Sequence, residues 1–218
     1  MFRYRLRELV GEERRLHYNK RQIIQSTDTQ NKFSLVKKGY IKRYLITNTG
    51  SLGIEVIYGP GDVFPLTLLF KKIFGRDIND SPETYYYEAM TDVDICSIDA
   101  DLLVDKINKN PLLYESLFME CGTRLHSTLN GLESLTLRTS YNRLAHQIVY
   151  LAGRFGKETS RGITLAIPLT HQDLANILGL TRETVSGNMI ELRKKGLVKT
   201  GRHITIPDID KLVEEAYG

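Results

Sequence analysis

Residues 170–196 read THQDLANILGLTRETVSGNMIELRKKG and contain two helix patterns joined by a short turn. Thr170 can cap the first helix, and Asp173 stands three residues on, close to a capping box. Gly179 lies where this helix must end, because glycine adopts the left-handed conformation at the least cost. Thr181 can cap the second helix. The stretch therefore predicts two helices separated by a tight turn.

The second helix of this stretch combines an apolar face with a polar first turn. Val185, Met189 and Leu192 recur at helical spacing and predict its buried face. Arg182 and Glu183 are the first two residues of the helix and make its first turn polar. Two helices with a glycine in the turn are typical of a helix-turn-helix, whose second helix enters the DNA major groove. There arginine can bond guanine, and glutamate can accept from cytosine. The alternative is a plain helical hairpin with solvated charges. The helix-turn-helix is favoured because capping residues, a helix-ending glycine and residues that can read bases follow one another in the required order.

A basic hairpin is predicted directly after the second helix. Residues 197–199 and 203–206 are short strand patterns on either side of the turn Thr200-Gly201-Arg202. Residues 141–206 hold ten lysines and arginines against four acidic residues, so positive charge gathers around this motif. A surface that binds phosphate requires such a concentration. The nine acidic residues of the stretch 77–105, which has no lysine or arginine, indicate a solvated face.

Residues 141–206 resemble the winged helix-turn-helix of the Crp/Fnr superfamily of bacterial transcription regulators. The matching strings are NRLA at 142–145, LTHQDLANILGLTRETVS at 169–186 and KKGLV at 194–198. The resemblance implies a homodimer that binds palindromic double-stranded DNA and contacts RNA polymerase through residues 155–162. The DNA-binding residues predicted from pattern and resemblance are Thr170, Gln172, Thr181, Arg182, Glu183, Thr184, Ser186, Gly187, Asn188, Arg193, Lys199, Arg202 and His203.

One position departs from the family pattern in the helix that would read DNA. The resemblance implies three base-reading side chains per half-site, and the third place is held here by Gly187. A glycine cannot reach a base, so we expect relaxed readout at one position of a half-site related to TGTGA or TTGAT. Ser186 and Asn188 are the candidates to replace part of that contact, although we expect Asn188 to point away from the groove.

Short strands separated by turn residues are predicted over residues 18–98, which suggests a β-barrel or jelly roll. KKGYIKRY at 37–44 and YGPGDVFPL at 58–66 resemble the glycine turns of the cyclic-nucleotide-binding jelly roll of the same family. Residues 1–17 predict a short basic helix. The candidate strands are Gln22–Gln25, Phe33–Val36, Tyr40–Thr47, Gly53–Tyr58, Tyr85–Met90 and Val93–Ile98.

A long helix is predicted from Pro111 onward, with apolar residues at alternating spacings of four and three that are typical of a helix-pairing seam. The alternative is a helix packed on its own domain. Since a helix-turn-helix usually binds two half-sites as a dimer, we favour a dimer interface. The seam consists of Tyr114, Phe118, Cys121, Leu125, Thr128, Leu132 and Leu135.

The predicted fold class is therefore α+β, in three parts. Residues 1–110 are expected to form a cyclic-nucleotide-binding-like β jelly roll with a sensor role. Residues 111–140 are expected to form the dimerisation helix and a hinge, and residues 141–218 the winged helix-turn-helix. Within the last part, a second amphipathic helix is predicted from Asn142 to about Arg154, and a short closing helix after Pro207.

The residues expected to bind the phosphate of a cyclic nucleotide are replaced. Pro65 and Leu66 stand where the family has Gly-Glu, and Glu83 stands where it has arginine. Phosphate needs a cation and N–H donors, so this departure argues against cyclic AMP. An apolar pocket, or simply filled core, is predicted around Phe64, Leu66, Leu68, Leu69, Phe70, Tyr85, Tyr86 and Tyr87, with Thr128 matching a ligand-contacting residue of the family.

Other cofactors find little support in the sequence. Cys96 and Cys121 are too few for a four-thiolate iron–sulfur cluster and are interpreted as buried small residues. His17, His126 and Met90 could ligate haem, but no spacing selects them. We therefore predict no cofactor, and leave haem or a small apolar effector as alternatives.

The sequence contains no long apolar run and no signal-peptide pattern, so we expect a cytoplasmic protein without a membrane partner. No enzyme motif such as G-x-S-x-G, a P-loop or a metal-ligand spacing is present, so an enzyme is not expected. The alternative to a DNA-binding regulator is a ligand-sensing module with a degenerate DNA reader that acts through protein contacts.

Overall fold

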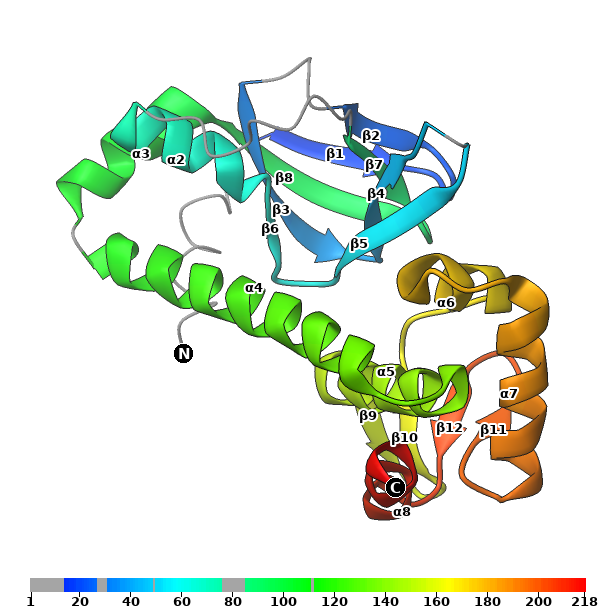
Figure 1. Cartoon of the computed structure of the whole chain (residues 1–218). Helices are drawn as coiled ribbons and strands as arrows, with labels where there is room; N and C mark the ends of the chain where they lie inside the picture. Colours follow the sequence, from blue (N-terminus) through cyan, green and yellow to red (C-terminus); the bar gives the residue numbers. More distant parts are fainter. Residues whose placement is uncertain (1–13, 27–30, 49, 76–84, 111) are drawn as a thin grey trace. The chain divides into compact units, whose positions relative to one another are not determined.

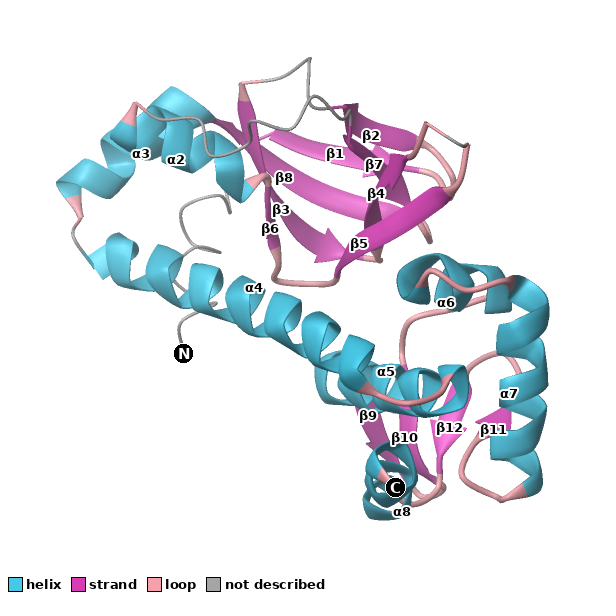
Figure 2. Cartoon of the chain, in the orientation of Figure 1, coloured by secondary structure: helices cyan, strands magenta, loops and turns pink. Residues whose placement is uncertain are grey.

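The computed structural model describes residues 14–26, 31–48, 50–75, 85–110 and 112–218. The chain divides into two compact units, residues 1–125 and 126–218. The division falls within the long helix α4 (Leu112–Thr136). Figure 2 shows that strands make up most of the first unit before α4, whereas helices predominate in the second. Within the described ranges, no helix is both long enough and apolar enough to cross a membrane.

The first unit contains two antiparallel four-stranded sheets, with strand orders β1-β8-β3-β6 and β2-β7-β4-β5 (Figure 1). They confirm the predicted jelly roll, and each predicted strand is present with its ends shifted by no more than two residues. The strands are β1 (Arg14–Tyr18), β2 (Ile23–Ser26), β3 (Lys32–Lys38), β4 (Ile41–Ile46), β5 (Leu52–Tyr58), β6 (Val63–Phe64), β7 (Tyr85–Ala89) and β8 (Val93–Asp99).

Strands β3 and β8 separate two apolar clusters, because successive side chains of a strand point to opposite faces. On one face, Phe33, Leu35, Cys96 and Ile98 pack with residues from three helices: Leu69, Leu103, Ile107, Leu113 and Leu117. On the other face, Val36, Val93 and Ile95 pack with residues from the second sheet and from β6: Ile24, Ile41, Tyr58, Phe64, Tyr87 and Ala89. Cys96 is fully buried, as predicted, whereas Cys121 is only half-buried.

The predicted helix over residues 1–17 is wrong at its C-terminal end. Arg14–Tyr18 form β1, which pairs antiparallel with β8 and places Leu16 opposite Ile95. Sheet pairing with a distant strand therefore overrides local helix propensity at these positions. Residues 1–13 lie outside the described residues.

The first unit contains two helices that were not predicted from the sequence, α2 (Leu66–Phe74) and α3 (Ala100–Lys109). Helix α2 follows Pro65 and ends at Gly75, and it buries Leu69 in the core. Helix α3 is capped by the Asp99 side chain, which accepts a hydrogen bond from the amide of Asp101. The two helices lie side by side, and both contribute to the same apolar cluster.

The predicted seam of α4 is exposed along most of its length in the single chain. Phe118 is 78% exposed, and Leu129, which is not part of the predicted seam, is exposed as well. Cys121 is half-buried. Leu113 and Leu117, by contrast, are buried in the core of the first unit. The other seam residues, Tyr114, Leu125, Thr128, Leu132 and Leu135, are all exposed, whereas Pro111 lies outside the described residues.

The second unit begins with the end of α4 and contains the predicted helices and wing. Its four-stranded antiparallel sheet has the order β11-β12-β10-β9. The closing helix after Pro207 is confirmed as α8. The elements are α5 (Ser140–Phe155), β9 (Gly156–Thr159), β10 (Gly162–Leu165), α6 (His171–Leu178), α7 (Arg182–Lys194), β11 (Lys199–Thr200), β12 (Ile204–Ile206) and α8 (Ile209–Tyr217).

Residues 155–162, which the family resemblance assigns to the contact with RNA polymerase, lie mostly at the surface but are not an irregular loop. They form strand β9 and the turn of a hairpin with β10. Gly162 has a φ of 104°, and a Cβ there would lie 2.2 Å from the carbonyl oxygen of Ile206. This close approach requires glycine, so it fixes where the hairpin turns. The wing strand β11 begins at Lys199, two residues later than the sequence pattern predicts.

Candidate nucleic-acid interface

The turn between α6 and α7 is built by local capping, as the sequence predicts. The Thr170 hydroxyl accepts from the amide of Asp173, and the Asp173 carboxylate accepts from the amide of Thr170, at 3.0 and 2.9 Å. Gly179 ends α6 with a φ of 62°. The Thr181 hydroxyl then accepts from the amide of Thr184 at 3.1 Å and caps α7. Both helix starts are therefore held by their own first turns.

The matching NRLA string holds this motif in place rather than reading DNA. Arg143 of α5 donates to the carbonyl oxygen of Leu178 at 2.6 Å, which satisfies a terminal carbonyl of α6. Asn142 donates to the carbonyl oxygen of Glu215 in α8 at 3.1 Å. Leu144 and Ala145 are fully buried. Residues on α5 thus anchor both α6 and α8.

Helix α7 buries one face and exposes the opposite one. Val185, Met189 and Leu192 are buried, as predicted. Arg182 and Glu183 are exposed in the first turn, directly after the Thr181 cap. Gly187 is exposed too, and a Cβ at this position would meet nothing within 4 Å.

Two predicted base contacts are occupied within the protein. Ser186 is hydrogen-bonded to the His171 ring at 2.8 Å, and it donates to the carbonyl oxygen of Arg182 at the same distance. Asn188 donates to the Ser140 hydroxyl at 3.1 Å. Asn188 therefore points toward α5. Both side chains next to Gly187 are therefore hydrogen-bonded within the protein.

The remaining predicted contacts lie at three places on the second unit. Gln172 is exposed on α6 and donates to Asn176 at 2.8 Å. Arg193 is exposed in the last turn of α7. Lys199 and Arg202 are exposed on the wing, whereas His203 is partly buried beside them.

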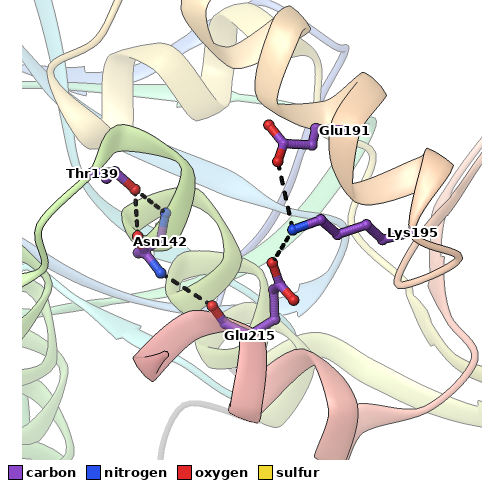
Figure 3. Close-up of polar contacts among 5 residues, drawn as sticks. All are labelled: Thr139, Asn142, Glu191, Lys195 and Glu215. Atoms are coloured by element: carbon purple, nitrogen blue, oxygen red, sulfur yellow. Dashed lines mark hydrogen bonds and ion pairs between the residues drawn. The ribbon is translucent and has the colours of Figure 1, made fainter.

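Lys195, which follows Arg193 and Lys194 at the end of α7, is tied to other residues of the protein. Its Nζ atom lies 2.6 Å from Glu215 Oε1 and 3.6 Å from Glu191 Oε1 (Figure 3). The cation also lies over the Tyr141 ring, 4.9 Å from its centroid. Burial raises the pKa of Tyr141 to about 12, and the Lys195 ammonium holds the pKa of Glu215 below its ordinary value. This cluster joins the end of α7 to α8 and α5.

Helix α8 also contacts the end of α4. Tyr217 donates to Glu133 Oε1 at 3.1 Å, and its ring packs edge-on against His146, with 5.5 Å between centroids. His146 is buried, and this burial lowers its pKa. The closing helix therefore connects α4, α5 and α7 within the second unit.

The apolar pocket predicted in the first unit is largely packed by its own rings. Phe64 stacks on Tyr87 with 5.0 Å between centroids, and Tyr58 packs against both. Arg43 lies 3.9 Å from the centroid of Tyr85. Leu66 packs against the other apolar cluster. Thr128 belongs to the second unit. For Phe64 and Tyr87 these contacts favour the alternative of filled core.

The candidate haem ligands differ in burial and in the unit to which they belong. His17 lies 2.7 Å from Asp94 Oδ1 and is exposed, and Met90 is buried in the first unit. His126 is exposed and belongs to the second unit. Throughout the described ranges, no group of three or more His, Cys, Asp or Glu residues is arranged to hold a metal ion.

The arrangement of α6, α7 and the basic wing agrees with the comparison with known proteins. The family model of the Crp-like helix-turn-helix domain matches residues 142–215. Residues 142–215 therefore form a Crp-like helix-turn-helix domain, and the relatives support a transcription regulator of the Crp/Fnr superfamily. A relative, the "CRP-like cAMP-activated global transcriptional regulator" of Mycobacterium tuberculosis, is 28% identical over 168 residues, which are 77% of this chain and 71% of that protein.

Other Crp/Fnr relatives match more of the chain. The "Anaerobic regulatory protein" of Haemophilus influenzae is 27% identical over 205 residues, which cover 93% of this chain and 76% of the relative. The structure of FixK2 from Bradyrhizobium japonicum has a TM-score of 0.74 at 21% identity and covers 92% of this chain and 96% of its own. This last likeness shows that the fold shared with FixK2 extends through both units.

Ile190 is an exposed residue of α7 that was not predicted from the sequence. It is 49% exposed on α7, seven residues after Glu183. Positions three, four and seven apart share a helix face, so this spacing is the signal that places Ile190 beside Gly187 and Glu183.

Proposed function

We propose that the protein is a dimeric, sequence-specific DNA-binding regulator of the Crp/Fnr type that does not respond to cyclic AMP. The main support for sequence-specific binding is the first turn of α7, where exposed Arg182 and Glu183 follow the Thr181 cap. Residues at this place of a helix-turn-helix meet base edges in the major groove. An arginine there suits guanine, and a glutamate suits the amino group of cytosine.

Phosphate contacts come from the residues around this helix. Arg193 stands exposed in its last turn, and Lys199 and Arg202 stand exposed on the wing. Thr170, Gln172 and Thr181 lie at or near the two helix starts, where backbone amides favour anions. Such contacts fix the position of the protein on the duplex and carry little sequence information.

The dimer is supported by the exposed apolar stripe of α4. Leu125, Leu132 and Leu135 are each more than half exposed and follow the heptad spacing of a paired helix. A second copy of this chain is the proposed occupant, because a two-fold protein matches a palindromic site. Residues 1–110 then serve as a sensor domain, and residues 141–218 as the DNA-binding domain.

No cofactor, enzymatic activity or membrane partner forms part of this proposal. The absence of a response to cyclic AMP rests on Pro65, Leu66 and Glu83 in the sequence, of which Glu83 lies outside the described residues. RNA polymerase is proposed as a further partner, with the β9–β10 hairpin as the contact. Lys157, Glu158 and Arg161 are exposed on that hairpin.

Selection from a pool of random duplexes tests the proposal. We expect the purified protein to enrich a palindrome, and salt to weaken its binding steeply, because phosphate contacts release counterions. A double variant, Arg182→Ala with Glu183→Ala, should lose the enriched sequence while keeping salt-sensitive binding.

A second candidate function is a ligand-sensing module whose DNA reader is degenerate, and the bare surface at Gly187 favours it. That function predicts salt-sensitive binding without any enriched sequence. The same selection experiment therefore separates the two candidates.

A further inference from the structure

The outward face of α7 changes character along its length. Glu183, Gly187, Ile190 and Lys194 are spaced four, three and four residues apart, so they share a face, and all four are exposed. The structure describes every residue from 140 to 218. Within this range, Ile190 and Tyr217 are the large hydrophobic residues whose side chains are exposed. The Tyr217 hydroxyl is hydrogen-bonded to Glu133, whereas Ile190 presents an aliphatic chain on the helix face that carries Glu183.

Two polar side chains on either side of Gly187 are engaged within the protein. Ser186 is bonded to His171, and Asn188 is bonded to Ser140. Gly187 contributes only backbone, with open space where a Cβ would stand. The centre of the face, between the carboxylate of Glu183 and the ammonium of Lys194, is therefore apolar.

The major groove presents one apolar group to a protein, the C5-methyl group of thymine. We propose that Ile190, standing beside the bare backbone of Gly187, packs against a thymine methyl group and selects thymine at one position of each half-site. This inference rests on the proposed DNA-binding function and names the chemistry of one contact within it. Gly187 permits the contact because no side chain at that position holds the helix away from the groove.

The test replaces thymine by deoxyuridine, which removes the methyl group and leaves every hydrogen-bonding group of the base unchanged. Each thymine of the selected palindrome is replaced symmetrically in both half-sites, and dissociation constants are measured by fluorescence anisotropy at fixed salt. We expect one position to weaken wild-type binding about fourfold per half-site, the effect of losing one buried methyl group, and about 15-fold for the dimer. All other thymine positions should change binding less than twofold.

Variants at Ile190 assign the effect to this residue. Ile190→Ala should bind thymine and deoxyuridine duplexes equally at the sensitive position, whereas Ile190→Val should retain most of the difference. Ile46 is 51% exposed on β4 of the other unit, so Ile46→Ala is a matched control that should behave as the wild type.

Two results would overturn the inference while leaving the proposed function intact. One is a selected site at which deoxyuridine has no effect at any position, and the other is a sensitive position that persists unchanged in Ile190→Ala. Failure to enrich any sequence would instead reject the proposed function, and this inference with it.

Discussion

Gly187 leaves the centre of the outward face of α7 without a side chain, which in the proposed function lets the backbone approach a base pair closely. A glycine inside a helix costs about 1 kcal/mol relative to alanine, so Gly187→Ala should stabilise the second unit by about that amount. Open space where the Cβ would stand means that an alanine at this position meets no clash.

Gly187→Arg should restore a base contact at this position. We expect the variant to discriminate by about 1–3 kcal/mol at one base pair of each half-site, as a good bidentate contact does. Site selection with the wild type, Gly187→Ala and Gly187→Arg measures this effect. If the arginine variant selects the same sequences as the alanine variant, Gly187 does not face the bases.

His146 makes the stability of the second unit dependent on pH. Its burial disfavours the charged ring, so its pKa in the folded chain lies below the ordinary value of 6.5. The unfolded chain therefore binds the proton first, and stability is lost as the pH falls below about 6.5. Glu215 has a lowered pKa as well, but its contribution is lost only at a more acidic pH, below its ordinary value of 4.5.

His146→Phe should remove this dependence, because phenylalanine keeps the edge-on packing against Tyr217 without titrating. Urea unfolding of the second unit at pH 7.5 and 5.5 should show a smaller loss of stability in the variant. The pKa shift of His17 has the opposite sign to that of His146, since the hydrogen bond to Asp94 raises the pKa of His17. His17→Asn is thus a control that should not reduce the loss on acidification, and an equal loss in wild type and His146→Phe would contradict the assignment.

At the scale of the element, the wing and the end of α7 should contribute differently to DNA binding. Arg202 is exposed on the wing, so Arg202→Ala should weaken binding to all sequences alike and flatten the salt dependence by about one unit of slope. Lys195 is held by Glu215 and Glu191, so Lys195→Ala should leave that slope unchanged. Gel-shift titrations over a series of salt concentrations measure both slopes. If Lys195→Ala flattened the salt dependence more than Arg202→Ala does, Lys195 rather than Arg202 would be the residue that contacts phosphate.

Features formed by neighbouring residues could be predicted from the sequence, whereas the contacts of Lys195 could not. The caps at Thr170 and Thr181 and the stop at Gly179 are local features, formed by residues within one helical turn. They could therefore be read from spacing alone. Lys195, in contrast, is held by Glu215, 20 residues further along the chain.

The elements that the sequence analysis misses depend on the same kind of distant contact. Arg14–Tyr18 form a strand because β8, which begins at Val93, offers an edge to pair with. Residues 156–165 form a hairpin whose inner strand β10 pairs with β12, and a polar, glycine-bounded run gives no local sign of that partner. Side-chain orientation at Ser186 was equally out of reach, because it depends on His171 in the preceding helix.

For the whole molecule, the sensor domain should not bind cyclic AMP at physiological concentrations. Leu66 begins α2 and packs against the core, where the family resemblance implies a carboxylate, and Pro65 lacks an N–H donor. Glu83 would repel a phosphate. Calorimetry of the purified protein with cyclic AMP should show no heat of binding, and tight binding would refute the assignment of Pro65, Leu66 and Glu83 to the phosphate-binding positions.

The last prediction concerns the pairing of two chains through α4. Leu125 and Leu132 are 61% and 56% exposed in the single chain, one heptad apart on the predicted seam. A glutamate at each position would face its own copy across a two-fold axis, so the double variant Leu125→Glu, Leu132→Glu should sediment as a monomer. The matched control is Phe74→Glu with Ile46→Glu, because these side chains are 61% and 51% exposed on other elements. The control should remain a dimer.

The same variants should separate in DNA binding, because a monomer engages one half-site and loses the benefit of a linked second one. That benefit is typically about a hundredfold or more, so the seam variant should lose at least this factor on a palindrome and almost nothing on a single half-site. The exposed control should lose nothing on either duplex. A seam variant that still sediments as a dimer and binds the palindrome at wild-type strength would show that α4 does not hold the two chains together, and that its apolar stripe has another occupant.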